Sequence, residues 1–382
     1  LEEQLQLLRN DPLVADIKAN LTAGSTPDQN ILKVTLSEAK TFSVRTFIDN
    51  YGNTSSGIFR AGATVQEANL TGNGDSIYLS YTRSGSSDNY SLGYLYPINP
   101  MGGTLGFNFF TGQSPVTEPP FNALNISTNI QTFELAYRQP IVRSLAEEFT
   151  LGASFIFASS SSFLNGDSFN FQNLLFDDGN SQTRVLNLSQ EYIKRDASGA
   201  LALRSSFNFG LDALGATIRN DNSPDGRFFY WVGQLLRVQR LGEDNDTLAT
   251  FRLNLQLTGD RLLSSNSFSL GGPQSVSGYR QSQLVGDNGI QSSLEIQFPV
   301  VRDADGVAIV KALPFIELGT IWNSQNNNFG NQSLFGIGLG TIYQPSRNIT
   351  LRLDYGIPLI NAGNPYTNLQ DSGMYFSFSA NF

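Results

Sequence analysis

Apolar and polar residues alternate with a period of two in many segments after Phe42. The clearest segments are 249–257, 290–298 and 349–355, where aliphatic or aromatic side chains occupy nearly every second position. Charged and amide side chains fill the positions between them. Because successive side chains of a β-strand point to opposite faces, each segment predicts a strand with one apolar and one polar face.

Two kinds of fold use such strands. A soluble sheet turns its apolar face toward a core, whereas an outer-membrane barrel turns it toward lipid and its polar face toward a wet lumen. We count about sixteen strands, an even number as expected for such barrels. Short joints alternate with long ones along most of the chain. The short joints are NLTGNG (69–74), PINPMGG (97–103), KRDAS (194–198), LGEDNDT (241–247) and QPSRN (344–348). The long ones are 50–57, 112–128, 164–182, 211–227, 259–288, 322–333 and 357–372.

The order of these joints favours an all-β transmembrane antiparallel barrel over residues 42–382. We expect its first and last strands to pair and close the wall. The outward-facing residues should include Leu351, Leu353, Phe376 and Phe378. The lumen-facing residues should include Arg252, Arg352 and Asp354. Since a charge at mid-bilayer is costly, this register should be strongly fixed.

The first 41 residues have a different pattern. Leucines recur at helical spacing in LEEQLQLLRN (1–10), and Asp11-Pro12 should end this helix. The segments 14–24 and 31–39 predict a strand pair around STPDQN (25–30). One helix and two strands cannot bury a core alone, so we expect the last part of a small α/β domain, outside the barrel on the short-turn side. The chain starts at Leu1 without a visible signal peptide, so we expect a processed or truncated N-terminus.

The composition agrees with a barrel. Of the 382 residues only 15% are charged, which is low for a soluble protein, and 12% are aromatic. No run approaches the roughly 20 apolar residues that a membrane helix needs. The formal net charge of −9 argues against a nucleic-acid partner, which requires a basic surface.

The chain contains neither cysteine nor histidine. This excludes thiol nucleophiles, Ser-His triads and thiolate or imidazole metal sites. Three acidic segments, 177–180, 221–226 and 242–247, carry oxygen ligands of the calcium type, but we interpret them as solvated turns. In the second, Val232 stands where a calcium loop has its bidentate Glu. We therefore expect no catalytic residues, no cofactor and no metal, and an outer-membrane enzyme is the least favoured function.

A glycine-rich loop at 259–288 separates two strongly alternating strands and contains LGGPQSVSGYRQSQLVGDNG (270–289). It is not a phosphate loop, because it has no Gly-Lys-Ser/Thr and opens no helix. It resembles the signature loop of the polypeptide-transporting barrel superfamily, which includes BamA-type insertases, chloroplast import pores and FhaC-type secretors. Their pattern is Val-Arg-Gly-Tyr/Phe, usually after Gly-Gly. The corresponding residues here are Gly271, Gly272, Val276, Ser277, Gly278, Tyr279 and Arg280, with Ser277 in place of the family Arg.

Further motifs carry the same resemblance. In ALPFIELGTIWN (312–323), Phe315, Glu317 and Gly319 are similar to the strand motif Phe-x-Asp-x-Gly. In the superfamily, the loop folds back into the lumen and its Arg meets the acidic residue of this strand. Three further segments also match, namely ANLTGNGD (68–75), LAYRQPIV (135–142) and DGRFFYW (225–231). The last two resemble the secretor branch in particular. Residues 1–41 resemble the end of a polypeptide-transport-associated (POTRA) domain.

The chain ends in GMYFSFSANF (373–382), with apolar residues at every second position up to Phe382. Such a strand resembles the C-terminal signal by which bacterial barrels are recognised for membrane insertion. The residues that would form it are Phe376, Phe378 and Phe382.

The resemblance implies an outer-membrane pore of the two-partner secretion type (FhaC/ShlB/HecB), with its N-terminal domain in the periplasm. Such a pore secretes an unfolded partner polypeptide without ATP. We expect a monomer in the lipid bilayer, assembled by the barrel-assembly machinery. A BamA-type insertase is the alternative, distinguished by several periplasmic domains. A passive solute porin would leave the signature loop and the N-terminal residues unexplained.

The wall motif leads to one specific expectation for the loop at 259–288. Phe315, Glu317 and Gly319 share the inward face of their strand, and a shielded carboxylate needs donors or a cation. Arg280 offers five donors and a full charge, so we expect it or another lumenal Arg to meet Glu317. Ser277 and Tyr279 should give weaker support. Three glycines on the next strand should leave room for the loop, namely Gly336, Gly338 and Gly340.

Overall fold

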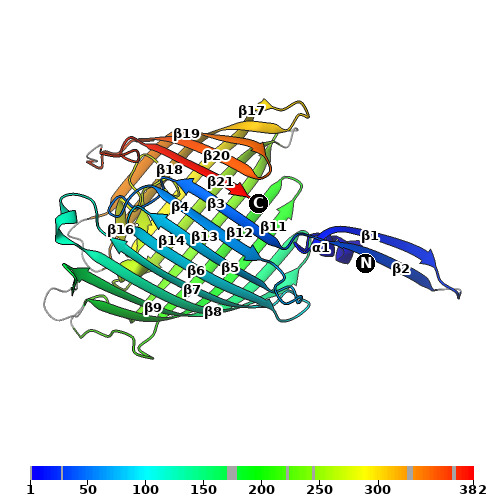
Figure 1. Cartoon of the computed structure of the whole chain (residues 1–382), viewed down its shortest axis with the longest axis horizontal. Helices are drawn as coiled ribbons and strands as arrows, with labels where there is room; N and C mark the ends of the chain where they lie inside the picture. The colour runs from blue at the N-terminus through cyan, green and yellow to red at the C-terminus, as the bar shows by residue number, and fades with distance from the viewer. Residues whose placement is uncertain are drawn as a thin grey trace.

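The computed structural model describes residues 2–26, 29–169, 179–220, 223–242, 246–324, 330–363 and 367–382. Within them, sixteen strands form one closed antiparallel barrel, which confirms the barrel part of the predicted fold class (Figure 1). Among the described residues, none of the helices has the length and apolar character needed to cross a membrane.

The wall strands follow one another in chain order. They are β3 (Phe42–Asp49), β4 (Arg60–Glu67), β5 (Ser76–Ser84), β6 (Ser87–Pro97), β7 (Thr104–Pro115), β8 (Ser127–Arg143), β9 (Glu147–Leu164), β11 (Asn180–Asp196), β12 (Gly199–Gly210), β13 (Phe228–Leu241), β14 (Thr247–Thr258), β17 (Asn288–Arg302), β18 (Ala308–Trp322), β19 (Gln332–Ser346), β20 (Ile349–Pro358) and β21 (Met374–Asn381). The short β10 (Asp167–Ser168) extends the hairpin of β9. As predicted, β21 pairs with β3, from Ser377 opposite Asp49 to Asn381 opposite Arg45, and closes the wall.

The two faces of the wall differ as the alternation predicts. Leu353 and Phe378 are 51% and 38% exposed on the outside, and Leu351 and Phe376 share their face. Between them, Asp354 is buried inside and accepts a hydrogen bond from Arg352 at 2.8 Å. Arg252 lies opposite Ser293, which in turn lies opposite Glu317 on the inner face. The predicted orientations are confirmed.

A charge introduced on the outer face should be costly. Leu353→Arg places a guanidinium at the middle of β20, toward lipid, and should lower the free energy of unfolding by roughly 2–4 kcal/mol. Denaturant unfolding in lipid vesicles measures this, with Leu36→Arg as the control, because Leu36 is 49% exposed but lies outside the barrel. An equal loss in both variants would contradict the assignment of this face to lipid.

The connections fall into two classes, one at each end of the barrel. Short turns such as 144–146, 197–198 and 347–348 lie at the end where both termini are found, whereas long connections such as 116–126 and 259–287 lie at the other. This agrees with the predicted alternation. The exception is the β5–β6 hairpin, which is joined at the long-loop end by only Gly85 and Ser86.

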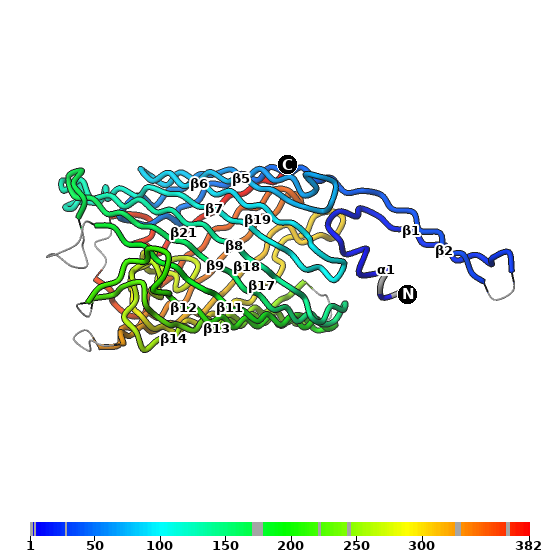
Figure 2. Tube along the Cα trace, turned by 90° about the horizontal axis from the view of Figure 1, so that it is seen from below, coloured from blue at the N-terminus to red at the C-terminus, as the bar shows by residue number. Residues whose placement is uncertain are grey.

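The N-terminal residues form α1 (Glu2–Arg9) and a separate hairpin of β1 (Val14–Ala23) and β2 (Asn30–Glu38). The predicted helix and strand pair are therefore confirmed, while Pro27 and Asp28 of the predicted turn lie outside the described residues. The hairpin projects beyond the short-turn end and leads directly into β3 (Figures 1 and 2). These three elements alone do not make a complete folded domain.

Candidate functional site

The connection between β14 and β17 runs against the inner wall rather than away from the barrel. It contains η2 (Ser264–Asn266) and a small hairpin of β15 (Phe268–Leu270) and β16 (Leu284–Gly286). Leu270, Val276 and Tyr279 are fully buried and pack against Ile321 of β18 and Leu334 of β19. We call residues 268–286 the inserted segment.

Glycines allow the backbone of the inserted segment to touch the wall. Gly278 has a left-handed φ of +92°, and a Cβ there would lie 2.7 Å from the Pro358 backbone nitrogen. From the wall side, a Cβ on Gly356 would lie 2.5 Å from the Gly278 nitrogen, and one on Gly336 would lie 2.4 Å from the Ser277 carbonyl oxygen. No other residue type fits this contact without movement.

The other two glycines of β19 have a different role from the one predicted. A Cβ on Gly338 would lie 2.3 Å from the ring of Phe315, and one on Gly340 would lie 2.3 Å from the carboxylate of Asp354. These glycines therefore make room for side chains of the wall itself. Only Gly336 of the three faces the inserted segment directly.

Glu317 accepts a hydrogen bond from the backbone N–H of Ser277, with 2.6 Å between nitrogen and oxygen. The predicted pair between Glu317 and Arg280 is wrong. Gly278 turns the chain after Ser277, so that Arg280 points away from β18 toward other connections. The carboxylate obtains this hydrogen bond from the main chain of residue 277, and the Ser277 hydroxyl lies beside it as a second donor.

Arg280 joins the inserted segment to two long connections. Its guanidinium donates to Asp371 over 2.5 and 2.8 Å and to Glu118 over 2.7 Å. The side chain of Asp371 is 0% exposed and that of Arg280 is 13% exposed. Burial raises the pKa of Asp371, but hydrogen bonds from Arg280 and Thr367 outweigh it and hold that pKa below its ordinary value.

Gln370 extends this arrangement to a third connection. Its side-chain amide donates to the carbonyl oxygens of Asn50 and Gly52, over 2.7 and 2.9 Å. Its carbonyl accepts the backbone N–H of Gln281 at 2.9 Å. The inserted segment is thus tied to the β3–β4, β7–β8 and β20–β21 connections at the long-loop end.

Two tyrosines fix the tip of the motif. The hydroxyl of Tyr279 lies 2.9 Å from the carbonyl oxygens of both Phe335 and Ile360. The hydroxyl of Tyr375 donates to the Tyr279 carbonyl over 2.7 Å and accepts the Gly278 N–H over 2.9 Å. Sequence reasoning missed Tyr375, Gln370 and Asp371. The position of Tyr375, a large residue on the inward face of the last strand, is the signal that could have identified it.

The remaining motif residues lie as follows. Gly271 and Gly272 have φ values of +106° and +94° and form a tight turn closed by a hydrogen bond from the Gly272 N–H to the Val276 carbonyl. Leu270 packs over Gly319, where a Cβ would lie 2.7 Å from its methyl group. On the outer face, Phe376 packs near Phe59, and Phe378 and Phe382 are 38% and 77% exposed, all apart from the inserted segment.

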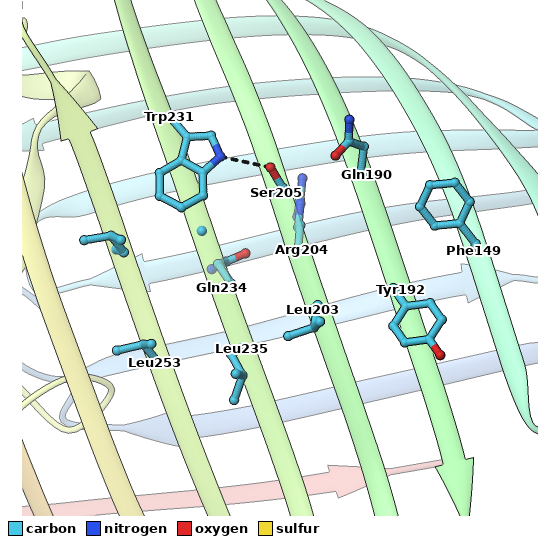
Figure 3. A pocket seen from close by; sticks show the side chains of 12 residues that line it. Phe149, Gln190, Tyr192, Leu203, Arg204, Ser205, Trp231, Gln234, Leu235 and Leu253 are labelled. Carbon is cyan, nitrogen blue, oxygen red and sulfur yellow. Dashed lines mark hydrogen bonds between the residues drawn. The ribbon is translucent and has the colours of Figure 1, made fainter.

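A separate hollow of about 340 Å³ lies on the outer face of β11 to β14 (Figure 3). Trp231 donates its indole N–H to Ser205 over 2.9 Å, and its ring covers Gly233. Leu253, which lines the hollow, is on the same face as the exposed Leu318. This hollow therefore belongs to the lipid-contacting surface and not to the lumen.

No group of three acidic residues in the described part of the chain could hold a metal ion. Each of the acidic segments 177–180, 221–226 and 242–247 lies partly outside the described residues.

The model of the family described as "Haemolysin secretion/activation protein ShlB/FhaC/HecB" matches residues 28–343, which include the inserted segment and Glu317. The chain belongs to this family. The resemblance found in its motifs is therefore confirmed. Together with the closed barrel, membership of the ShlB/FhaC/HecB family indicates a two-partner secretion transporter of the bacterial outer membrane.

Solved structures support the fold. CdiB from Escherichia coli aligns with a TM-score of 0.81 at 16% identity, covering 97% of this chain and 69% of that one. CdiB from Acinetobacter baumannii aligns with a TM-score of 0.76 at 19% identity, covering 100% of this chain and 68% of that one. BamA from Haemophilus ducreyi lacking POTRA domains 1–3 aligns with a TM-score of 0.67 at 17% identity, covering 99% of this chain and 77% of that one. A comparison with curated protein sequences gives no significant match.

Proposed function

We propose that this chain secretes an unfolded partner polypeptide through its lumen, and that this transport uses no ATP. The observation that carries the proposal is the inserted segment, which bears the family motif and lies inside a closed barrel. It is held by polar contacts to Glu317, Asp371 and Glu118 and by the burial of Leu270, Val276 and Tyr279 against the wall. A passing polypeptide can replace both the polar and the apolar contacts, so the segment can be displaced during transport. A passive porin has no need of it.

Residues 1–41 belong in this proposal to the last part of a periplasmic POTRA domain. A short helix followed by a β-hairpin, joined directly to β3, supports this assignment. The domain would receive the partner polypeptide before it enters the lumen. The pore acts as a monomer, inserted by the barrel-assembly machinery through the strand that ends at Phe382.

An insertase of the BamA type is the second candidate, and the seam of the barrel favours it. The β21–β3 ladder runs from Ser377–Asp49 to Asn381–Arg45, and backbone hydrogen bonds between Val44 and Phe382 and from Asn50 to Phe376 extend it at its ends. The β8–β9 ladder, by contrast, runs from Ser127–Phe163 to Arg143–Glu148. A short seam could open toward lipid. If the chain is an insertase, depleting it from the cell should slow the insertion of unrelated outer-membrane barrels. If it is a secretor, depletion should leave the rate of their insertion unchanged.

The Glu317 contact provides the test of secretion. Co-expression with a candidate partner polypeptide should release that polypeptide into the medium, and Glu317→Ala should reduce the release several-fold. Asp305→Ala is the matched control, because Asp305 lies in an exposed short turn. Heat-modifiable electrophoretic mobility should show that both barrels assemble. Unchanged release from Glu317→Ala would refute the role of the segment.

A further inference from the structure

The outward side chains of β11 to β13 are arranged in rows that run across the strands. The middle row pairs Gln190 of β11 with Ser205 of β12, and Ser205 with Gly233 of β13. The two neighbouring rows carry large apolar or aromatic residues, which include Tyr192, Leu203 and Leu235 on one side and Leu188, Phe207 and Trp231 on the other. Because Ser205 and Gly233 are small, the wall is hollowed by about 340 Å³ at the middle row (Figure 3). This volume is at the lower end of the range typical of ligand pockets, roughly 300–1,000 Å³.

Two polar side chains of the middle row face lipid. Ser205 accepts the indole N–H of Trp231 over 2.9 Å, and its hydroxyl can donate one further hydrogen bond. The Gln190 side chain is exposed, and none of the described residues forms a hydrogen bond with its amide. The hydrocarbon core of a bilayer contains no water, so an unpaired amide is unfavourable there. The hollow therefore suits an apolar ligand that also brings a hydrogen-bond acceptor.

Charged side chains lie on the same strands and the same face, nearer the short-turn end. Lys194 follows Gln190 by four positions on β11, and Arg237 follows Gly233 by four positions on β13. Four residues correspond to about 13 Å along a strand and, at the usual tilt of membrane strands, to about 10 Å in depth. The cations therefore lie near the surface of the bilayer, while the hollow lies within its hydrocarbon core.

Each of these cations has a carboxylate beside it. Lys194 Nζ lies 4.0 Å from a carboxylate oxygen of Glu147, and Arg237 Nη1 lies 3.9 Å from one of Asp196. The four side chains are 29–52% exposed, and exposed pairs at such distances are weak. Both signs of charge are thus available to a ligand. This surface complements a group that carries a phosphate and an ammonium better than a group that is only anionic.

We propose that the outer face of β11 to β13 is a binding site for one phospholipid whose head group carries a phosphate and a primary ammonium. The phosphate lies between Lys194 and Arg237, and the ammonium donates to the carboxylates beside them. The Gln190 amide donates to an ester carbonyl, the acceptor that joins an acyl chain to the glycerol. One acyl chain then fills the hollow against the indole of Trp231. Any bulk lipid can supply an acyl chain, but only this head group satisfies both signs of charge.

Tryptophan fluorescence tests this site, because the chain contains only two tryptophans. Trp322→Phe leaves Trp231 as the single reporter, at the hollow. Trp231→Phe leaves Trp322, which lies on the outer face of β18, four positions from the exposed Leu318, and reports on bulk lipid. Both variants are reconstituted in phosphatidylcholine vesicles with a small, increasing fraction of phosphatidylethanolamine or phosphatidylglycerol. The acyl chains of the added lipid are dibrominated and quench tryptophan.

The reporter at the hollow should distinguish the two head groups. In Trp322→Phe, half-maximal quenching should require about fivefold less brominated phosphatidylethanolamine than brominated phosphatidylglycerol. In Trp231→Phe, the two lipids should quench alike. Equal quenching of Trp231 by the two lipids, or stronger quenching by phosphatidylglycerol, would overturn the proposal.

Substitutions in the Trp322→Phe background test the recognising groups. Gln190→Leu removes the amide and Lys194→Gln removes a cation, and each should reduce the preference for phosphatidylethanolamine to less than about twofold. Thr320→Val is the matched control, because the Thr320 hydroxyl is also exposed on the outer face but bonds Ser333 away from the hollow. Heat-modifiable mobility verifies that each barrel assembles. A preference that survives both Gln190→Leu and Lys194→Gln would also overturn the proposal. None of these measurements involves a partner polypeptide, so their outcome is independent of the proposed function.

Discussion

Replacement of Arg280 by Gln should open the long-loop end of the barrel. The substitution removes the cation between Asp371 and Glu118 and leaves a carboxylate with a 0% exposed side chain unpaired. Removing one partner of a buried ion pair costs about 3–5 kcal/mol, enough to release the two connections from the inserted segment. Single-channel recordings in planar bilayers should show a larger conductance and more frequent full openings.

The control for this variant is Arg83→Gln. Arg83 also pairs with a carboxylate, Asp88, at the long-loop end, but the two side chains are 56% and 35% exposed. Exposed pairs contribute at most about 1 kcal/mol, so conductance should stay at the wild-type level. Equal behaviour of the two variants would show that the Arg280 contacts do not restrain the connections.

The same pair predicts how the wild-type channel responds to acid. A carboxyl whose folded-state pKa is lowered contributes stability above its unfolded value, and that contribution is lost as the pH falls through the folded value. Since the pKa of Asp371 is held below its ordinary value of 3.8, the Arg280 contact should survive mild acidification. Conductance should therefore not rise between neutral pH and about pH 5.

Gly278→Val should prevent the inserted segment from seating against the wall. A valine at a φ of +92° is strained by roughly 1–2 kcal/mol, and its Cβ would also collide with the backbone nitrogen of Pro358 at 2.7 Å. The wall is hydrogen-bonded independently of the segment, so the barrel should still assemble. Amide hydrogen exchange should become fast at Val276 and Tyr279, and secretion should fall several-fold.

Gly72→Val separates the strain from the contact. Gly72 has a similar φ of +83°, but a Cβ there meets nothing within 4 Å. Gly72→Val should carry the same backbone strain. It should nevertheless leave amide hydrogen exchange in the inserted segment, and the amount of secreted partner, unchanged. Slow exchange at Tyr279 in Gly278→Val would show that the segment tolerates a side chain at its point of contact.

The wall of the barrel could be predicted from the sequence because the alternation of apolar and polar residues is visible within each strand. Each strand needs one face for lipid and one for the lumen, so the positions of Leu353 and Asp354 follow from alternation alone. The connection lengths follow from the breaks in that pattern. The short β5–β6 hairpin departs from the order because its turn needs only Gly85, with a φ of +55°, and Ser86.

The partners of Arg280 could not be predicted in the same way. Asp371 and Glu118 lie 91 and 162 positions away, in connections without any periodicity. The sequence identified the need of Glu317 for a donor correctly but assigned the donor to a side chain. A backbone N–H has no signature in the sequence, and the turn at Gly278 that sends Arg280 elsewhere depends on a three-dimensional contact with Pro358.

The main-chain donor to Glu317 also bears on how this motif can diverge. Because the main chain makes this contact, it survives the replacement of the signature Arg by Ser277 in this chain. The constraint falls instead on Gly278, Gly336 and Gly356, whose backbones leave no space for a Cβ. In this chain the seat of the segment is therefore set by three glycine backbones on two wall strands and one loop rather than by the charge of a signature side chain.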